Sequence, residues 1–194
     1  MPNSPSKAKT NTTPQSKKNE SLNIITFAKL KAAYPSSPPC DTEAFPDQCA
    51  IKVSTALRGA GASLKSFKGV CCWQPEHKGM KHVLRAEELA NWLKKRYLAN
   101  WPNPVDITGK DWQTKIENKT GVIFFKDYWL RKGEKFPSGD HIDLWDKDEL
   151  TSGGIAGILR FWLGIDTLDV SWLHEKLVYS NLGDSKQILF WEIK

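Results

Sequence analysis

Two short segments, far apart in the chain, contain residue types that could carry out nucleophilic chemistry. Positions 47–54 read Asp-Gln-Cys-Ala-Ile-Lys-Val-Ser and include Cys49, whereas positions 139–146 read Gly-Asp-His-Ile-Asp-Leu-Trp-Asp and include His141. A thiolate is a strong nucleophile, and an imidazole can take up a thiol proton and return it later to a leaving group. If the fold brings Cys49 and His141 together, the pair could cleave an amide through a thioester.

The segment around Cys49 predicts a helix that begins near Asp47 as its N-cap. Val53, Ala56 and Leu57 follow Cys49 at helical spacing, and Gly59 and Gly61 end the pattern. The first turn of a helix has unpaired backbone N–H groups and the positive end of the helix dipole, which stabilise a thiolate. The N–H groups of Gln48 and Cys49 are also expected to stabilise the oxyanion that forms on an attacked carbonyl.

The segment around His141 predicts a strand. His141, Asp143 and Trp145 alternate with Ile142 and Leu144, so the two sets should point to opposite faces. A cysteine and a distant histidine are weak evidence of catalysis by themselves, because buried cysteines commonly pack as small hydrophobic residues.

Three pieces of this chain together resemble the fourth family of type VI secretion amidase effectors. They are the cysteine segment 48–54, the glycine-led strand Thr120-Gly-Val-Ile-Phe-Phe125, and the histidine segment 139–145. An apolar strand at 188–193 is similar to the end of the family's sequence. The resemblance covers roughly residues 40–194, apart from the stretch between about 153 and 185.

The resemblance implies an α+β, papain-like fold of the NlpC type, with the nucleophile at a helix N-terminus packed on an antiparallel sheet that carries the histidine. It implies a cysteine amidase that cuts the γ-D-glutamyl to meso-diaminopimelate bond in peptidoglycan stem peptides of a rival bacterium. By position, Cys49 would be the nucleophile and His141 the general base. A toxic effector also implies a secretion apparatus and a cognate immunity protein as partners. No cofactor is expected.

The third catalytic position is where this chain departs from the family, which has an aspartate eleven residues after the histidine. If Asp146-Lys147 forms a two-residue turn, His141 lies opposite Ser152, which can accept a hydrogen bond from the imidazole. Ser152 is therefore the first candidate to orient His141. Asp143, on the same strand face, and Asp148, at the turn, are the alternatives.

The first 22 residues differ in composition from the rest of the chain. They are rich in Ser, Thr, Asn, Pro, Gln and Lys, and contribute about half of the net charge of +6. This composition predicts a disordered basic tail over 1–22 and one papain-like amidase domain over 23–194. The tail has no apolar core typical of a Sec signal. We therefore expect a protein made in the cytoplasm, secreted without a Sec signal and delivered to the periplasm of a target cell.

The remaining sequence predicts four helices and three strands. Helices are expected over 24–34, 86–97, 155–163 and in a short turn at 172–177, and strands over 121–125, from His141, and over 188–193. The stripe Leu89, Trp92, Leu93 and Tyr97 should be buried on the second helix. Residues 126–139 should form a loop. No apolar run is long enough to predict a membrane span.

The other cysteines and histidines are scattered, and the sequence predicts no metal site. Cys40, Cys71 and Cys72 form no C-x-x-C pair with Cys49 or with each other, and His77 and His82 flank a Lys-rich loop in which solvent exposure is expected. Cys40 could form a disulfide with Cys71 or Cys72 in an oxidising compartment, but the spacing does not determine which.

Two other functional classes compete with the amidase hypothesis. The sequence pI of about 9.1 and the basic, aromatic run 128–132 would suit a nucleic-acid-binding protein. However, half of the excess positive charge lies in the tail and no nucleic-acid module is present, so nucleic acid is not an expected partner. Alternatively, the same fold could be an inert binding or toxin-like module, or an acyltransferase. Rapid alkylation of Cys49 would separate a catalytic thiol from an inert one.

Overall fold

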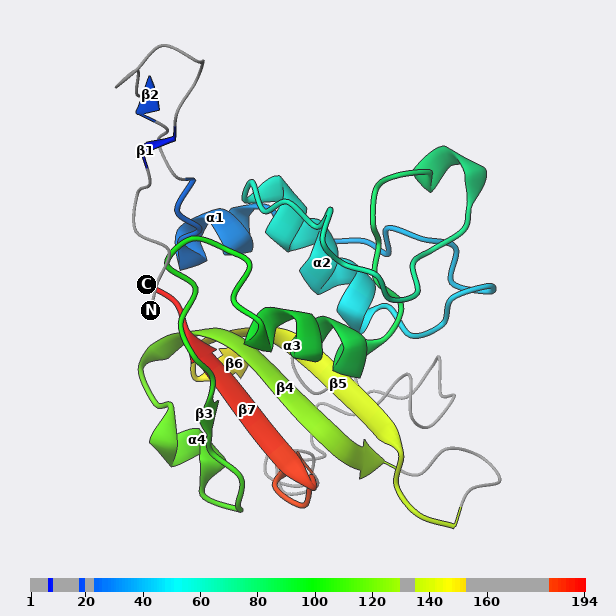
Figure 1. Ribbon diagram of the computed structural model, residues 1–194. Helices are drawn as coiled ribbons and strands as arrows, with labels where there is room; N and C mark the ends of the chain where they lie inside the picture. The colour runs from blue at the N-terminus through cyan, green and yellow to red at the C-terminus, as the bar shows by residue number, and fades with distance from the viewer. Residues whose placement is uncertain (1–6, 9–17, 20–22, 130–134, 153–181) are drawn as a thin grey trace.

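The computed structural model describes residues 7–8, 18–19, 23–129, 135–152 and 182–194 of the chain (Figure 1). No helix in these ranges is long and apolar enough to cross a membrane. Most of the predicted tail, the basic run 130–132 and the two predicted helices at 155–163 and 172–177 lie outside the described residues. Within the tail, Lys7–Ala8 (β1) and Lys18–Asn19 (β2) pair as a short antiparallel ladder.

A five-stranded antiparallel sheet forms the centre of the fold. Its strands lie in the order β3-β7-β4-β5-β6. Their bounds are Val105–Asp106 (β3), Lys119–Trp129 (β4), Gly139–Lys147 (β5), Glu149–Leu150 (β6) and Gln187–Glu192 (β7). The histidine strand β5 therefore pairs with the long strand β4 on one side and with the two-residue strand β6 on the other.

Three helices cover one face of the sheet, and a short helix lies against the other (Figure 1). The three are α1 (Phe27–Ala32), α2 (Cys49–Gly59) and α3 (Ala86–Lys94); the short one is α4 (Trp112–Lys115). A 3-10 turn, η1, spans Pro75–His77. Both α2 and α3 contact β5, so the cysteine helix lies directly on the strand that carries His141.

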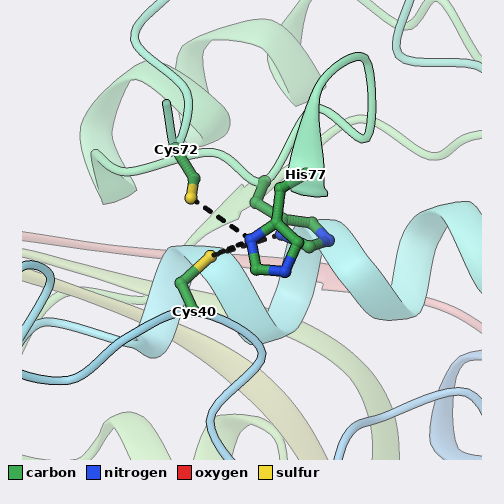
Figure 2. Close-up of side chains that lie close together, drawn as sticks. Cys40, Cys72 and His77 are labelled. Atoms are coloured by element: carbon green, nitrogen blue, oxygen red, sulfur yellow. Dashed lines mark hydrogen bonds between the residues drawn. The ribbon is translucent and has the colours of Figure 1, made fainter. Parts of the chain in front are cut away.

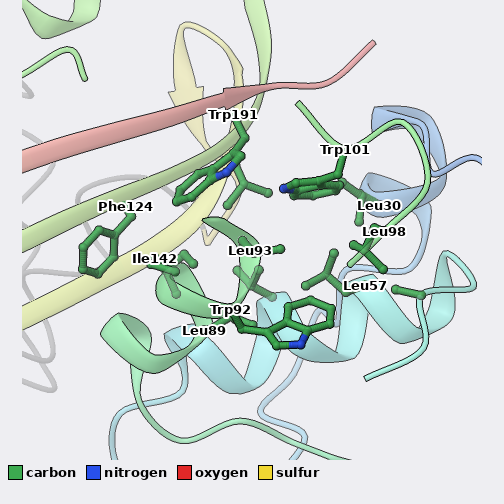
Figure 3. Packing of buried hydrophobic residues seen from close by; sticks show 14 of the residues in the cluster. Leu30, Leu57, Leu89, Trp92, Leu93, Leu98, Trp101, Phe124, Ile142 and Trp191 are labelled. Carbon is green, nitrogen blue, oxygen red and sulfur yellow. The ribbon is translucent and has the colours of Figure 1, made fainter. Parts of the chain in front are cut away.

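Side chains that alternate along the strands build two apolar cores. Phe124, Ile142 and Trp191 point toward the three helices and pack with Leu57, Leu89 and Leu93 (Figure 3). Val122 and Leu144 belong to the same core. Ile123, Phe125, Trp145 and Phe190 point the other way and pack with Trp112 and Ile116. Because both faces of the sheet are covered, β5 is held on both sides, and the alternation predicted for residues 141–145 is observed.

Several predicted boundaries were wrong by a few residues. The second predicted helix ends at Lys94 because Arg96 has a left-handed φ of 57°, and Tyr97 is 50% exposed instead of buried. β4 continues to Trp129, past the predicted loop start at residue 126, through an irregularity between Phe125 and Trp129. Neither β3 nor α4 was predicted, since two and four residues give no periodic pattern to detect.

The predicted register of the hairpin after His141 was also wrong. Trp145 pairs with Leu150 and Asp146 with Glu149, so the two-residue turn is Lys147-Asp148 instead of Asp146-Lys147. Lys147 has the left-handed φ of 66° that this turn requires. The pairing is thus shifted by two residues, which moves Ser152 away from His141 and beside Asp143.

Candidate active site

Cys49 is the first residue of α2, and Gln48 is its N-cap, in place of the predicted Asp47. The first backbone hydrogen bond of the helix runs from the Lys52 N–H to the Gln48 carbonyl (2.9 Å), so the preceding N–H groups at the start of the helix have no partner within α2. The Cys49 side chain is partly buried and packs against the helix-side core. A thiol at this position lies at the positive end of the α2 dipole.

His141 is 7% exposed and lies among aromatic rings of β4. Its imidazole stacks on Phe125, with ring centroids 6.3 Å apart, and meets the edge of Tyr128 at the same centroid distance. Burial lowers the pKa of His141, but interactions with the Asp143 carboxylate and the Cys49 side chain outweigh burial and raise the pKa to about 10. The structure thus brings the two residues of the sequence hypothesis, Cys49 and His141, into contact and favours the imidazolium form.

Asp143 is fully buried and its carboxylate receives several donors. Oδ1 accepts hydrogen bonds from the Tyr34 hydroxyl (2.8 Å) and the Leu144 N–H (2.8 Å), and Oδ2 accepts one from the Ser152 N–H (3.1 Å). Oδ2 also lies 3.8 Å from Nε2 of His141, a charge contact longer than a hydrogen bond. Burial raises the pKa of Asp143, but His141, Ser152 and Tyr34 together bring it below its ordinary value.

The two other candidates for the third position differ in their surroundings. Among the described residues, no hydrogen bond joins Ser152 to His141; the Ser152 backbone contacts Asp143 instead. Asp148 is exposed at the tip of the β5–β6 turn. Of the three candidates, Asp143 is the one in contact with the imidazole.

Tyr34 is a site residue that the sequence did not indicate. It follows the end of α1, and the hydroxyl of its partly buried side chain reaches Asp143 on β5, 109 residues later in the chain. Burial raises the pKa of Tyr34, and the Asp143 carboxylate raises it further, so the hydroxyl remains a donor. No local motif marks Tyr34, because the contact depends on how α1 packs against α2 and the sheet.

A second group of ligand-type side chains lies apart from Cys49 and His141. The Cys40, Cys72, His77 and His82 side chains place their ligand atoms within 4.8 Å of one another. Figure 2 shows the sulfur atoms of Cys40 and Cys72 directed at the His77 ring. The expectation that His82 is exposed was wrong: it is 5% exposed, and burial lowers its pKa to about 4. No such group was predicted, because the four residues are scattered in the sequence. All four cysteines are free thiols.

Comparisons with known proteins identify a family and a similar fold. Residues 45–191 match the family model described as type VI secretion system (T6SS), amidase effector protein 4 (Tae4). A solved structure, the type VI effector Tae4 from Enterobacter cloacae, has a similar fold, with a TM-score of 0.50 and 15% sequence identity over 88% of this chain and 98% of that one. Among curated protein sequences, none matches.

The structural match confirms the predicted α+β architecture of papain-like NlpC type. The family match extends from just before the cysteine helix to the last strand, and so includes Cys49, His141 and Asp143. The chain therefore belongs to the Tae4 family of type VI secretion amidase effectors, antibacterial hydrolases that act on peptidoglycan.

Proposed function

We propose that this family member hydrolyses the bond between γ-D-glutamate and meso-diaminopimelate in peptidoglycan stem peptides, with Cys49 as the nucleophile. The observation that carries the proposal is the contact of Cys49, at the start of α2, with a buried His141 that in turn contacts the carboxylate of Asp143. A thiol next to an imidazole, which is in turn next to a carboxylate, is the catalytic triad of enzymes that transfer acyl groups through a cysteine.

In the acylation step, the Cys49 thiolate attacks the γ-carbonyl carbon of the D-glutamyl residue. The carbonyl π electrons move to oxygen, and the N–H groups at the start of α2, which have no partner within the helix, stabilise the oxyanion. When the tetrahedral intermediate collapses, the C–N bond breaks and the amine of diaminopimelate leaves with the proton of His141. The products of this step are a thioester on Cys49 and a neutral imidazole.

In the deacylation step, His141 takes a proton from a water molecule as the water oxygen attacks the thioester carbonyl. The C–S bond then breaks, the γ-carboxyl group of D-glutamate is released, and the thiolate and imidazolium are restored. Asp143 is in a position to hold the imidazole in one orientation and to stabilise its positive charge. In this proposal, Ser152 acts through Asp143, by the hydrogen bond from its backbone N–H.

The proposed biological setting is delivery of the enzyme to the periplasm of a target cell. Peptidoglycan is accessible from that compartment. We also propose a cognate immunity protein that protects the producing cells by covering the entrance to Cys49. Because Cys49 is partly exposed at the helix start, a partner that fills this entrance would block attack on the stem peptide.

The test is digestion of purified muropeptides from a Gram-negative wall, resolved by chromatography and mass spectrometry. Wild type and Cys71→Ala should each release two kinds of fragment, one that ends in D-glutamate and one that begins with diaminopimelate. Cys49→Ala should release neither. Cys71 is a matched control because it is a partly exposed cysteine in contact with neither His141 nor Asp143 in the described structure. Cleavage by Cys49→Ala, or fragments split at another bond, would contradict the proposal.

A further inference from the structure

The group formed by Cys40, Cys72, His77 and His82 has no part in the proposed amidase chemistry, and its geometry indicates a ligand. Cys40 comes from the loop before α2, and the other three residues come from the loop between α2 and α3. Cys40, Cys72 and His82 are buried, and His77 is half-buried. Two loops thus meet, with the ligand atoms of two thiols and two imidazoles close together.

Three sulfur-to-nitrogen distances within the group are close to those around a tetrahedral zinc ion, and all the ligand atoms lie within 4.8 Å of one another. The Sγ of Cys40 lies 3.5 Å from Nδ1 of His77 and 3.3 Å from Nδ1 of His82, and the Sγ of Cys72 lies 3.4 Å from Nδ1 of His77. Zinc binds sulfur at about 2.3 Å and imidazole nitrogen at about 2.0–2.1 Å, and with tetrahedral angles this separates sulfur from nitrogen by about 3.6 Å.

Hydrogen bonds alone do not account for the three contacts. The Nδ1 of a neutral His77 has either one lone pair or one proton, so it forms one good hydrogen bond, yet two sulfur atoms lie against it. Likewise, the single proton of the Cys40 thiol is within reach of two nitrogen atoms. A cation at the centre would engage the two sulfur atoms and the two nitrogen atoms at once.

We infer that Cys40, Cys72, His77 and His82 form a structural zinc site of the Cys2His2 type. Four protein ligands complete the tetrahedron and leave no position for water or substrate, so the ion would stabilise the fold and would not take part in hydrolysis. The two sulfur ligands favour zinc over magnesium or calcium, which prefer oxygen.

The surroundings of the four residues resemble the supporting shell of a metal site. The Cys72 N–H donates to the His82 carbonyl (2.8 Å), which fixes two of the ligands relative to each other. Phe45, Ile51 and Leu84 pack with Cys40 and Cys72, and the Cys72 thiol also contacts Oε1 of Gln74 (3.4 Å). A site of this kind would clamp the loop before α2 to the loop before α3.

The site would also help to position the proposed nucleophile. Gln48, next to Cys49 in the chain, donates from Nε2 to the carbonyls of Cys40 (3.2 Å) and Phe45 (2.5 Å). Holding Cys40 in place therefore fixes the residue that caps α2. Loss of the ion should loosen the start of α2 without removing any group that reacts.

The experiment measures zinc in protein purified from zinc-supplemented cells under reducing conditions. Wild type, Cys49→Ala and Cys71→Ser should each contain about one zinc ion per chain, and Cys40→Ser, Cys72→Ser and His82→Asn much less. Cys71→Ser is the matched control, since Cys71 adjoins Cys72 in sequence but lies outside the group. Retention of zinc by Cys49→Ala would show that the site is independent of the proposed catalytic reaction.

A second measurement avoids variants that fail to fold. Wild-type protein stripped of metal and titrated with Co²⁺ should develop the intense visible absorption of tetrahedral cobalt with a thiolate-to-metal charge-transfer band. A chelator should lower the melting temperature of zinc-loaded wild type and Cys71→Ser. The inference would be overturned by reduced wild-type protein that takes up neither ion, by equal zinc content in Cys40→Ser and wild type, or by octahedral cobalt.

Discussion

The hydroxyl of Tyr34 donates a 2.8 Å hydrogen bond to Oδ1 of Asp143. This bond joins the end of α1 to the strand that carries His141, and it is one of three hydrogen bonds that the carboxylate accepts from described residues. A buried carboxylate without such donors would favour its neutral form. Tyr34 thus keeps Asp143 ionised beside the imidazole, although the Tyr34 hydroxyl is not itself placed to react.

Replacing Tyr34 with Phe should remove that donor and keep the ring. A hydrogen bond to a charged group contributes about 1.5–3 kcal/mol. Its loss should raise the activation free energy by a similar amount, so kcat should fall by roughly one to two powers of ten. The pKa of Asp143 should rise, which moves the acid limb of the pH–rate profile to higher pH. Tyr97→Phe is the control, because Tyr97 is half exposed. An unchanged acid limb in Tyr34→Phe would exclude this positioning role.

Asp143→Asn and Ser152→Ala should differ sharply in activity. The amide of Asn cannot stabilise an imidazolium as an anion does, so Asp143→Asn should lower kcat by about 10²–10⁴-fold. Ser152→Ala keeps the backbone N–H that contacts Asp143, so its rate should stay within about threefold of wild type, a change of less than 1 kcal/mol. Muropeptide hydrolysis measures both, and a larger loss in Ser152→Ala would instead assign the orienting role to the serine hydroxyl.

The lowered pKa of Asp143 also predicts how stability depends on pH. The folded-state pKa lies below the ordinary value of 3.8, so the ionised carboxylate stabilises the fold above that pH, and this contribution is lost as the pH falls through the folded-state pKa. The unfolding free energy of Asp143→Asn should therefore decline less steeply than that of wild type between about pH 5 and 2. A carboxyl group with an ordinary pKa in the unfolded state and a lowered pKa in the folded state titrates over about this range. Denaturant unfolding at several pH values would measure it, and equal acid slopes in the two proteins would contradict it.

The ionisation of His141 can be followed directly by NMR. Two neighbours, Asp143 and Cys49, raise its pKa to about 10 against the opposing effect of burial. Cys49→Ala removes one of them, so the pKa of His141 should be lower in that variant than in wild type. Asp143→Asn should lower it as well, and the double variant should lower it furthest. A titration of the ring Cε1–H signal that is unchanged by Cys49→Ala would show that the two side chains do not interact.

A close backbone approach in the sheet predicts a large stability effect at Gly121. A Cβ atom at this position would lie 2.0 Å from the Trp191 carbonyl oxygen on β7, and neither strand can move without disturbing the core. Gly121→Ala should therefore destabilise the protein by about 3 kcal/mol. Gly79→Ala, where no atom lies within 4 Å of the added Cβ, should cost only about 1 kcal/mol for its positive φ. Denaturant unfolding would compare them.

The parts of the site that the sequence could predict are those marked by local patterns. Helical spacing after Cys49 and alternation around His141 were enough to predict the elements that carry both residues, because each pattern is the period of its own secondary structure. No such pattern predicted which two residues form the turn after His141. Lys147 adopts a left-handed conformation that lysine rarely favours, and this one angle shifted the hairpin by two residues and changed which side chain adjoins Asp143.

The cysteine and histidine group could not be predicted from the sequence for a different reason. Cys40 lies 37 residues from His77 and 42 from His82, and no short spacing links it to them. They meet because Phe45 and Ile51 pack with Cys72 and Leu84, which draws the two loops together. Tyr34 and Asp143 meet in the same way, through the packing of α1 on α2. Tertiary packing of this kind leaves no periodic signal.

The place of β7 in the sheet has a consequence for protein synthesis. β7 lies between β3 and β4, and Leu189 and Trp191 belong to the core beneath the helices. During synthesis, β4 and β5 leave the ribosome long before β7, which pairs with β4 on the side away from β5. The nascent chain therefore cannot close either core until Glu192 has left the exit tunnel. Both cores, and with them the packing that holds β5, are therefore completed only after translation has passed β7.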